Sequence, residues 1–472
     1  MKTKKFRKRI PFILSVAVLL MCVATTAKAQ PNGKTTPYTY FGQPVKSNYT
    51  YGQNIKKTLT SSSSALSSSA LSSSALNSSA LNSSASRSSA LSSSALSSSA
   101  SRSSASSSST SSSIISTNKP LKSSGLIVGY YDGWSAYSGF TPNKINASQI
   151  NVINYAFATI GTDLKITACM PDIDYSNFAQ LRTLKSKYSG LKTVISIGGW
   201  SDSGQFSNAA LTQASRDTFA DSVVSFVKTY GFDGVDIDWE YPTGGGLSSN
   251  ISRPADKTNY GLLLETLRSK LDAQGILDNK HYILSIAGQA DSTFASGVGL
   301  SQIANSIDYA YIMTYDLHGP WDTYTDFDAP LYTPTGTSPQ YETSVSSAVS
   351  TWLNDGFPAS KLVMGVPFYG YLYTGTVNSN AGIWQKFSSG TSVGYDTICS
   401  EYLTNPAFSK HYDSTADEPW LFNGSSFLCY EDPNSIALKT KYAESRGLLG
   451  VGAWDIGYDQ SGTLINVIRN NL

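Results

Sequence analysis

The sequence is poor in the residues that most transition-metal sites use. Only three histidines, His281, His318 and His411, occur among its 472 residues. Four cysteines are present, and one of them falls within the first 29 residues. Because such sites are built largely from histidine and cysteine, this scarcity argues against a histidine-based metal site. We therefore expect no metal and no cofactor.

An excess of basic charge is also lacking once the first 29 residues are set aside. That segment carries seven of the 35 Lys and Arg residues and no acid, so the remainder has 28 basic and 33 acidic residues, a net charge of −5. No nucleic-acid surface is expected from this balance. Beyond the first 29 residues, no apolar run is long enough to cross a bilayer.

The first 29 residues have the layout of a secretory signal peptide. A basic start is followed by an apolar run from Ile10 to about Val23 and then by the small-residue motif Ala27-Lys28-Ala29. We expect cleavage after Ala29 and a secreted protein with no membrane attachment afterwards. A retained anchor is the weaker alternative, because the run is short for a span of roughly 20 residues.

Two segments without a core follow the signal peptide. Residues 30–60 are rich in Tyr, Asn, Gly and Thr, and no fold is predicted for them. In residues 61–123, serine dominates and Ala recurs every five residues from Ala65 to Ala105. A period of five fits neither a helix nor a strand, and too few large apolar side chains are present to offset the entropy of ordering. We interpret 61–123 as a disordered linker, with a self-associating repeat as the alternative.

Residues 124–472 have the pattern of one globular α/β domain. Short apolar runs of β type recur at 126–131, 150–158, 192–199, 232–239, 282–288, 307–315, 361–369 and 448–455. Helix-like segments, such as 217–231 and 260–275, separate most of them. Eight strands that alternate with helices predict a (β/α)8 TIM barrel. An open doubly wound sheet is less attractive, because no glycine-rich phosphate loop follows the first run.

The seventh and eighth runs are separated by about twice the spacing of the others. The excess, 371–433, contains several aromatic residues together with Cys399 and Cys429. Long structureless loops are uncommon, so we expect a small inserted subdomain here. The two cysteines could form a disulfide and leave Cys169 unpaired, or all three could be free thiols.

The fourth run holds an unusual density of acids. In GFDGVDIDWEYP, residues 231–242, four carboxylates fall within eight positions. Side chains of a strand alternate between its faces, so Asp236, Asp238 and Glu240 share one face and the apolar residues between them share the other. The apolar set would pack beneath the helices. The acids therefore point into the barrel, with Glu240 nearest the mouth where barrel enzymes place their chemistry.

These three acids, the acid ladder, cannot easily all be ionised in a low dielectric, so at least one proton should stay on them. A carboxylic acid that keeps its proton near neutral pH is what the cleavage of a glycosidic bond requires. Glu240 is the predicted proton donor. An ion-paired structural cluster is disfavoured because no Lys or Arg lies on the inward strand faces, and three acids in line reach one metal ion poorly.

Four stretches, in order along the chain, resemble glycoside hydrolase family 18 chitinases. DGVDIDWE is similar to the family signature D-x-x-D-x-D-x-E, and SIGGW (196–200) to its S-x-G-G third strand. MTYDLHGPWD (313–322) and GVGAWDIGYD (450–459) are similar to its sixth and eighth strands. Residues 371–433 resemble the α+β insertion that many of these chitinases carry between strands 7 and 8. The resemblance implies a monomeric enzyme that hydrolyses β-1,4 links in chitin or chitin oligosaccharides.

The resemblance also implies a retaining mechanism without an enzyme nucleophile. The N-acetyl carbonyl of the substrate would attack its own anomeric carbon while Glu240 protonates the glycosidic oxygen. Asp238 would hold the acetamido N–H, and Asp236, backed by Ser196, would share a proton with Asp238. Tyr315 would donate its hydroxyl to the acetamido carbonyl. Structural roles in the motifs fall to Asp233, Gly198 and Gly199.

Sugar binding is assigned in the same way. Trp454 would lie under the sugar at the cleavage position and Trp200 on the leaving side, with Asp316 in contact with the bound sugar. The other implied substrate-binding positions are Met313, Tyr130 and Phe157. His318 is expected to be a hydrogen-bonded loop residue. One departure is Tyr371, where many relatives carry Arg.

Two other functions are compatible with the same residues. One is an endo-β-N-acetylglucosaminidase acting on N-glycans, and the other is a chitinase-like lectin that binds without cutting. The long insertion and Trp200 favour chitin over N-glycans. The presence of Glu240, Asp238 and Tyr315 favours catalysis over binding alone.

Overall fold

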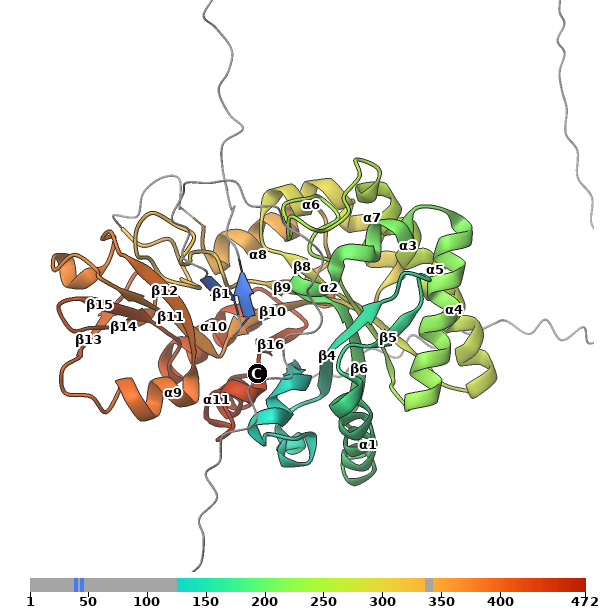
Figure 1. Cartoon of the computed structure of the whole chain (residues 1–472), viewed down its shortest axis with the longest axis horizontal. Coiled ribbons are helices and arrows are strands. Elements are labelled where there is room, and N and C mark those ends of the chain that lie inside the picture. Colours follow the sequence, from blue (N-terminus) through green and yellow to red (C-terminus); the bar gives the residue numbers. More distant parts are fainter. Residues whose placement is uncertain (1–37, 41–42, 46–124, 336–342) are drawn as a thin grey trace, which may run out of the picture. The chain divides into compact units, whose positions relative to one another are not determined.

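The computed structural model describes residues 125–335 and 343–472 in full, and two short backbone strands before them (Figure 1). These strands, β1 (Tyr38–Tyr40) and β2 (Gln43–Val45), pair antiparallel in a region for which no fold was predicted. The predicted signal peptide and linker lie outside the described residues. Within the described part, no helix combines the length and the apolar character that a membrane crossing needs.

In the described residues, eight parallel strands close into a barrel, which confirms the predicted (β/α)8 fold. Neighbours pair in the order β3, β4, β6, β7, β8, β9, β10 and β16, and β16 returns to β3 with Gly450 opposite Leu126. Each predicted run overlaps one of these strands, and β3, β4 and β8 extend one or two residues beyond their runs. Their bounds are β3 (Leu126–Asp132), β4 (Val152–Ile160), β6 (Lys192–Gly198), β7 (Gly234–Asp238), β8 (Ile283–Gln289), β9 (Tyr309–Met313), β10 (Leu362–Pro367) and β16 (Gly450–Trp454). Strand β5 (Ile166–Ala168) adds to β4 antiparallel.

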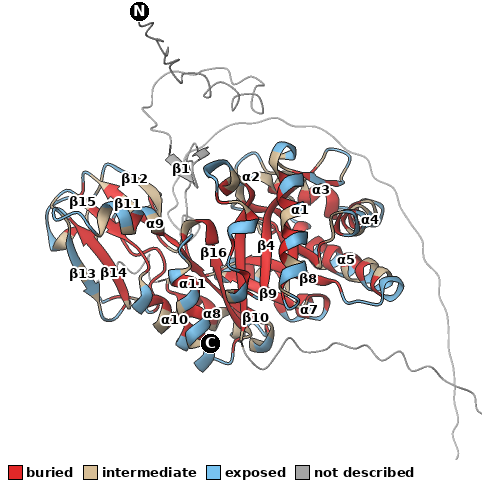
Figure 2. Ribbon diagram, turned by 90° about the horizontal axis from the view of Figure 1, so that it is seen from below, coloured by how far each residue is buried: buried red, intermediate tan, exposed pale blue. Residues whose placement is uncertain are grey.

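Helices surround the barrel and turn their apolar faces toward it (Figure 2). Those between barrel strands are α1 (Pro171–Lys187), α2 (Gly199–Asp202), α3 (Phe206–Ala210), α4 (Gln213–Tyr230), α5 (Asp256–Asp278), α6 (Ser292–Val298), α7 (Leu300–Ser306), α8 (Val345–Asn354) and α10 (Pro433–Ser445); α11 (Thr463–Asn471) follows β16. Short 3-10 turns, among them η1 (Gly133–Ser138), replace an α-helix between β3 and β4.

The two helices quoted from the sequence begin earlier than predicted. Helix α4 starts at Gln213, after a capping box between Thr212 and Ser215, and ends before Gly231 at a φ of 75°. Its first turn is polar, so apolar periodicity does not reveal it, whereas the cap satisfies free N–H groups there. The strands beneath are buried on both faces, as expected for a parallel sheet covered by helices.

The predicted insertion between the seventh and eighth barrel strands is a five-stranded antiparallel sheet with short helical turns. Its order is β12, β11, β15, β14, β13. The bounds are β11 (Tyr369–Thr374), β12 (Ser389–Gly394), β13 (Ser409–Asp413), β14 (Glu418–Phe422) and β15 (Ser426–Cys429), with α9 (Tyr395–Thr397) after β12. Figure 1 shows this sheet beside the barrel. It has its own small apolar cluster, which includes Leu421 and Leu428.

Cys399 and Cys429 are both free thiols, so a disulfide between them is not formed. Cys429 is buried, and its Sγ lies 3.7 Å from the carbonyl oxygen of Tyr371. The predicted pairing of Cys399 with Cys429 is therefore wrong, and the alternative of three buried thiols holds only for Cys429, because Cys169 and Cys399 are partly exposed.

Candidate active site

Asp236 is the deepest member of the acid ladder and lies in the middle of β7. Its Oδ2 accepts hydrogen bonds from Tyr130 (2.9 Å) and Ser196 (2.8 Å), and its Oδ1 accepts one from Ser285 (2.7 Å). Burial raises the pKa of Asp236, and the three hydroxyls oppose this in part. The contact from Ser196 is the one that the resemblance implied. Ser285 was not predicted, although a lone Ser within the apolar run of β8 was its signal.

Asp238, two positions further, has fewer partners. It is 4% exposed, and its Oδ1 accepts no hydrogen bond from the described residues. Burial, followed by the charges of Glu240 and Asp236, raises its pKa well above the ordinary range. Among the described residues no hydrogen bond joins Asp236 to Asp238, so the proposed shared proton has no direct bridge in this arrangement. The free acceptor of Asp238 is instead available to a donor in the site.

Glu240 follows the end of β7 at the mouth of the barrel and is 7% exposed. Its backbone is held on both sides: the N–H donates to Oγ of Ser203 (2.9 Å), and the carbonyl accepts from Nδ2 of Asn250 (3.1 Å). Burial raises the pKa of Glu240 to about 8; a hydrogen bond from Tyr241 opposes this, and the charge of Asp316 adds to it. Its surroundings therefore favour the protonated form of Glu240 over the charged form.

The motif residues outside the ladder have separate contacts. Asp233 accepts the N–H of Thr193 (2.9 Å) and forms an ion pair with Lys185 (2.7 Å), so it ties the start of β7 to β6 and α1. Gly198 has a φ of 106°, and a Cβ there would lie 2.2 Å from the carbonyl oxygen of Asp238. A Cβ on Gly199 would lie 2.6 Å from the ring of Phe157. Gly198 therefore permits close approach to the ladder, and Gly199 permits close approach to Phe157.

An aromatic cluster lies beside the ladder. The ring of Trp454, at the end of β16, stacks on Phe157 with centroids 5.6 Å apart and lies 5.5 Å from Tyr130. Trp134, on η1, is 6.5 Å from Trp454 and was not predicted, although it closely follows the first strand run. Tyr130 is 1% exposed and donates its hydroxyl to Asp236, the deepest acid of the ladder. Trp200 is half-buried at the exit of β6.

Tyr315 and Met313 lie at the exit of β9. Tyr315 is 7% exposed, and its ring centroid is 6.2 Å from those of Tyr311 and Tyr369. Burial raises the pKa of the Tyr315 hydroxyl well above its usual value, so it remains a neutral hydrogen-bond donor. Met313, the last residue of β9, is half-buried.

Asp316 is held by Tyr371, which the sequence marked as a departure, and by two residues that the sequence did not single out. Its Oδ1 accepts hydrogen bonds from Tyr369 (2.5 Å) and Tyr371 (2.6 Å) on β11. Its backbone N–H donates to Oδ1 of Asp328 (2.7 Å). Tyr371 thus donates a hydroxyl at the position where the resemblance leads one to expect an Arg. The signal for Tyr369 and Tyr371 was the alternating tyrosines of PFYGYLY, whereas nothing marked Asp328.

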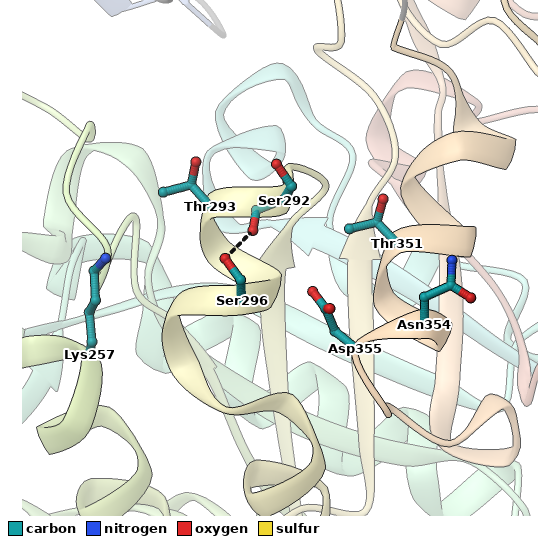
Figure 3. A pocket seen from close by; sticks show the side chains of 7 residues that line it. All are labelled: Lys257, Ser292, Thr293, Ser296, Thr351, Asn354 and Asp355. Carbon is teal, nitrogen blue, oxygen red and sulfur yellow. Dashed lines mark hydrogen bonds between the residues drawn. The ribbon is translucent and has the colours of Figure 1, made fainter. Parts of the chain in front are cut away.

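Two further features lie away from the ladder. His318, expected to be a loop residue, is buried with Nδ1 3.5 Å from a carboxylate oxygen of Asp322. A polar hollow between α5, α6 and α8 contains none of the ladder acids, and within it Ser296 donates to the carbonyl oxygen of Ser292 at 2.7 Å (Figure 3). Its lining residues are Lys257, Ser292, Thr293, Ser296, Thr351, Asn354 and Asp355. In the described ranges, no group of three or more His, Cys, Asp or Glu is arranged to hold a metal ion.

A protonated glutamic acid at the mouth of a (β/α)8 barrel, next to a second buried carboxyl and an aromatic cluster, is the arrangement of a glycoside hydrolase. The sequence model described as "Glycosyl hydrolases family 18" matches residues 126–459. The chain therefore belongs to glycosyl hydrolase family 18.

Individual relatives agree with this assignment. Chitinase A1 of Niallia circulans is 37% identical over 407 residues, which cover 73% of this chain and 58% of that protein. A probable endochitinase of Caenorhabditis elegans is 30% identical over 354 residues, 70% of this chain and 55% of that protein. The chain thus spans somewhat more than half the length of these two relatives.

Solved structures show the same fold. A family 18 N-acetylglucosaminidase from Paenibacillus barengoltzii has a TM-score of 0.68 at 33% identity, covering 74% of this chain and all of that one. A Group IV chitinase of Ostrinia furnacalis, solved in complex with allosamidin, has a TM-score of 0.69 at 30% identity, with 73% and 98% covered.

Proposed function

We propose that this chain is a secreted chitinase that hydrolyses β-1,4 links between N-acetylglucosamine units. The observation that carries the proposal is Glu240, whose proton is retained to a pKa of about 8 at the barrel mouth. An acid of this kind can protonate a leaving glycosidic oxygen at neutral pH. The names of the relatives, chitinase and endochitinase, support chitin as the substrate class.

The mechanism that fits this site is retaining and assisted by the substrate. Asp238 has a carboxylate oxygen without a partner among the described residues, which suits it to accept the N–H of an acetamido group. In its charged form it would stabilise the positive charge that develops when the acetamido carbonyl attacks the anomeric carbon. Tyr315, a neutral donor at the exit of β9, would hold that carbonyl in line.

The substitution Asp238→Asn tests this mechanism. We expect kcat on chitin oligosaccharides to fall by about 100-fold or more, because an amide cannot offset the developing charge. Asp233→Asn is the matched control: it lies on the same segment but pairs with Lys185, so kcat should be retained. An unchanged kcat in Asp238→Asn would refute the role of Asp238.

The substrate is tested by a product profile with anomer analysis. Chitin oligomers and an N-glycan are offered side by side to the wild-type protein, with Glu240→Gln as the inactive reference. We expect β-anomeric products from chitin oligomers and no cleavage of the N-glycan. Cleavage of the N-glycan alone would favour the endo-β-N-acetylglucosaminidase, and release of single sugars only would favour an exo-acting enzyme, as the name of the Paenibacillus relative suggests. Binding without cleavage would favour the lectin.

Secretion and the monomeric state are part of the same proposal. Export is supported by the basic start, apolar run and Ala27-Lys28-Ala29 of the first 29 residues. Expression of the full chain in a secreting host, followed by N-terminal sequencing and light scattering, tests both. The expected mature protein begins at Gln30 and has the mass of one chain.

A further inference from the structure

Asp316 is restrained by contacts on both its side chain and its backbone. Tyr369 and Tyr371 are successive residues on one face of β11. Both of their hydroxyls donate to the same oxygen, Oδ1 of Asp316. The backbone N–H bonds to Asp328, a residue of the same β9–α8 loop. The φ of Asp316 is 53°, a left-handed conformation that aspartate adopts more readily than most residues. These contacts decide where the carboxylate points.

The same contacts favour the ionised form of Asp316. Two O–H groups that donate to one oxygen stabilise the carboxylate over the acid. The resulting charge acts on two neighbours, because Asp316 contributes to the raised pKa of Glu240, which follows β7, and of Asp328. Glu431 and Lys439 act in turn on Asp328, with opposite signs. The charge on Asp316 thus helps Glu240 to keep its proton.

Tyr371 differs from an arginine at this position in one decisive way. A guanidinium would bond to Asp316 and also place a positive charge beside it, which would weaken the field that Asp316 exerts on Glu240. A tyrosine hydroxyl orients the carboxylate and adds no charge. The tyrosine therefore preserves the electrostatic effect of Asp316 while fixing its direction.

We propose that Tyr371, together with Tyr369, is a positioning residue of the reaction, which fixes the direction of the Asp316 carboxylate, whose charge acts on the proton donor Glu240. By this route the inserted sheet, of which β11 is a strand, acts on the chemistry of the barrel. The inference rests on the proposed hydrolase function and adds to it a role for the position at which this chain departs from many of its relatives.

The first test compares Tyr371→Phe with Tyr373→Phe. Tyr373 lies two residues further on the same strand, is buried, and its hydroxyl has no hydrogen-bond partner among the described residues. In Tyr371→Phe, Asp316 loses one of the two hydroxyls that fix its direction, so its effect on Glu240 should weaken. The basic limb of kcat/KM should then move to lower pH, by less than in Asp316→Asn, on whichever of chitin oligomers or N-glycan is cleaved. Tyr373→Phe should follow the wild-type profile.

The second test asks whether Tyr371 acts through Asp316. In an Asp316→Asn background, adding Tyr371→Phe should cause no further shift of the profile, because the acceptor charge is already gone. Tyr371→Arg should move the basic limb to lower pH, since the new charge favours ionised Glu240. Two results would overturn the proposal. One is an active Tyr371→Phe enzyme whose pH profile equals that of Tyr373→Phe. The other is a shift caused by Tyr371→Phe that persists in the Asp316→Asn background.

A third measurement does not depend on activity. The melting temperature of Tyr371→Phe, relative to Tyr373→Phe, should be lower at neutral pH, and the difference should shrink as acid protonates the carboxylate. The sign follows because the lost hydrogen bond stabilises ionised Asp316 and so contributes only where the carboxylate is charged. A difference that does not vary with pH would contradict the proposal. A wild-type protein that cleaves neither substrate yet shows this pH dependence would refute the hydrolase function alone.

Discussion

Glu240 and Asp238 project from the same strand face, but their surroundings differ. Glu240 lies at the mouth with its backbone tied to Ser203 and Asn250, and its carboxyl keeps a proton to a pKa of about 8. Asp238 is deeper and lies between two other acids. One site can therefore offer a proton and, a few ångströms away, an acceptor for an N–H group. This division of roles arises from position along a single strand.

At this scale, Glu240→Gln should separate binding from chemistry. The amide keeps the shape of the side chain but has no acidic proton, so turnover should fall by about 10²–10⁴-fold, the range of general acid catalysis. Oligosaccharide affinity, measured by calorimetry, should remain close to that of the wild type. Retained turnover would show that another group supplies the proton.

The pH dependence of the reaction is also set at the residue scale. Glu240 must be protonated, so the basic limb of kcat/KM should fall near pH 8. Asp316→Asn removes a negative charge that raises the pKa of Glu240, so the basic limb should move to lower pH. A basic limb that moved upward in this variant would contradict the assigned interaction.

At the scale of elements, the exit of β6 brings its backbone close to that of the ladder. Gly198 has a φ of 106° and would bring a Cβ within 2.2 Å of the carbonyl oxygen of Asp238. The strand can therefore turn into α2 beside β7 only if this residue has no side chain. The S-x-G-G stretch thus fixes the approach of one barrel strand to the next.

Gly198→Ala should destabilise the fold. Strain at this φ, together with a clash against backbone, should cost about 2–4 kcal/mol, measured by chemical denaturation. Gly190→Ala is the matched control, because Gly190 is exposed and a Cβ there meets nothing within 4 Å. Equal stability of the two variants would argue against the close approach.

At the scale of the whole molecule, a buried ion group joins the insertion to the barrel. Lys439 on α10 is fully buried and donates to Glu418 of β14 (2.7 Å) and to Glu431, which follows β15. The pKa of Asp328, which accepts the backbone N–H of Asp316, is lowered by the charge of Lys439 and raised by that of Glu431. The ammonium group of Lys439 thus interacts with several buried carboxyl groups that come from different elements.

Lys439→Met should reveal this dependence. Removing the cation leaves buried carboxylates without compensation, and the free energy of unfolding should fall by about 3–5 kcal/mol. Lys441→Met, on the exposed side of the same helix, should change it by less than about 0.5 kcal/mol. Thermal and denaturant unfolding of both variants provide the measurement.

The alternation of apolar runs and helices predicted the eight barrel strands and their order, because burial on both faces leaves a clear pattern in sequence. Parity placed three acids on one face of β7. Ser285, Trp134, Tyr369 and Asp328 were not predicted as site residues. Their contacts join parts of the chain that no local pattern connects, such as the hydroxyl of Ser285 and Asp236, 49 positions away.

The sequence by itself determined the barrel, the inserted segment and the acid ladder, since these follow from local periodicity and from the alternation of side chains along a strand. Only the tertiary structure decided which hydroxyls bond to Asp236, how deeply the ladder is buried and how Asp316 is held. Those properties depend on burial and on hydroxyls that β3, β6, β8 and β11 bring together. Desolvation and hydrogen bonding act through space, so no local pattern encodes them.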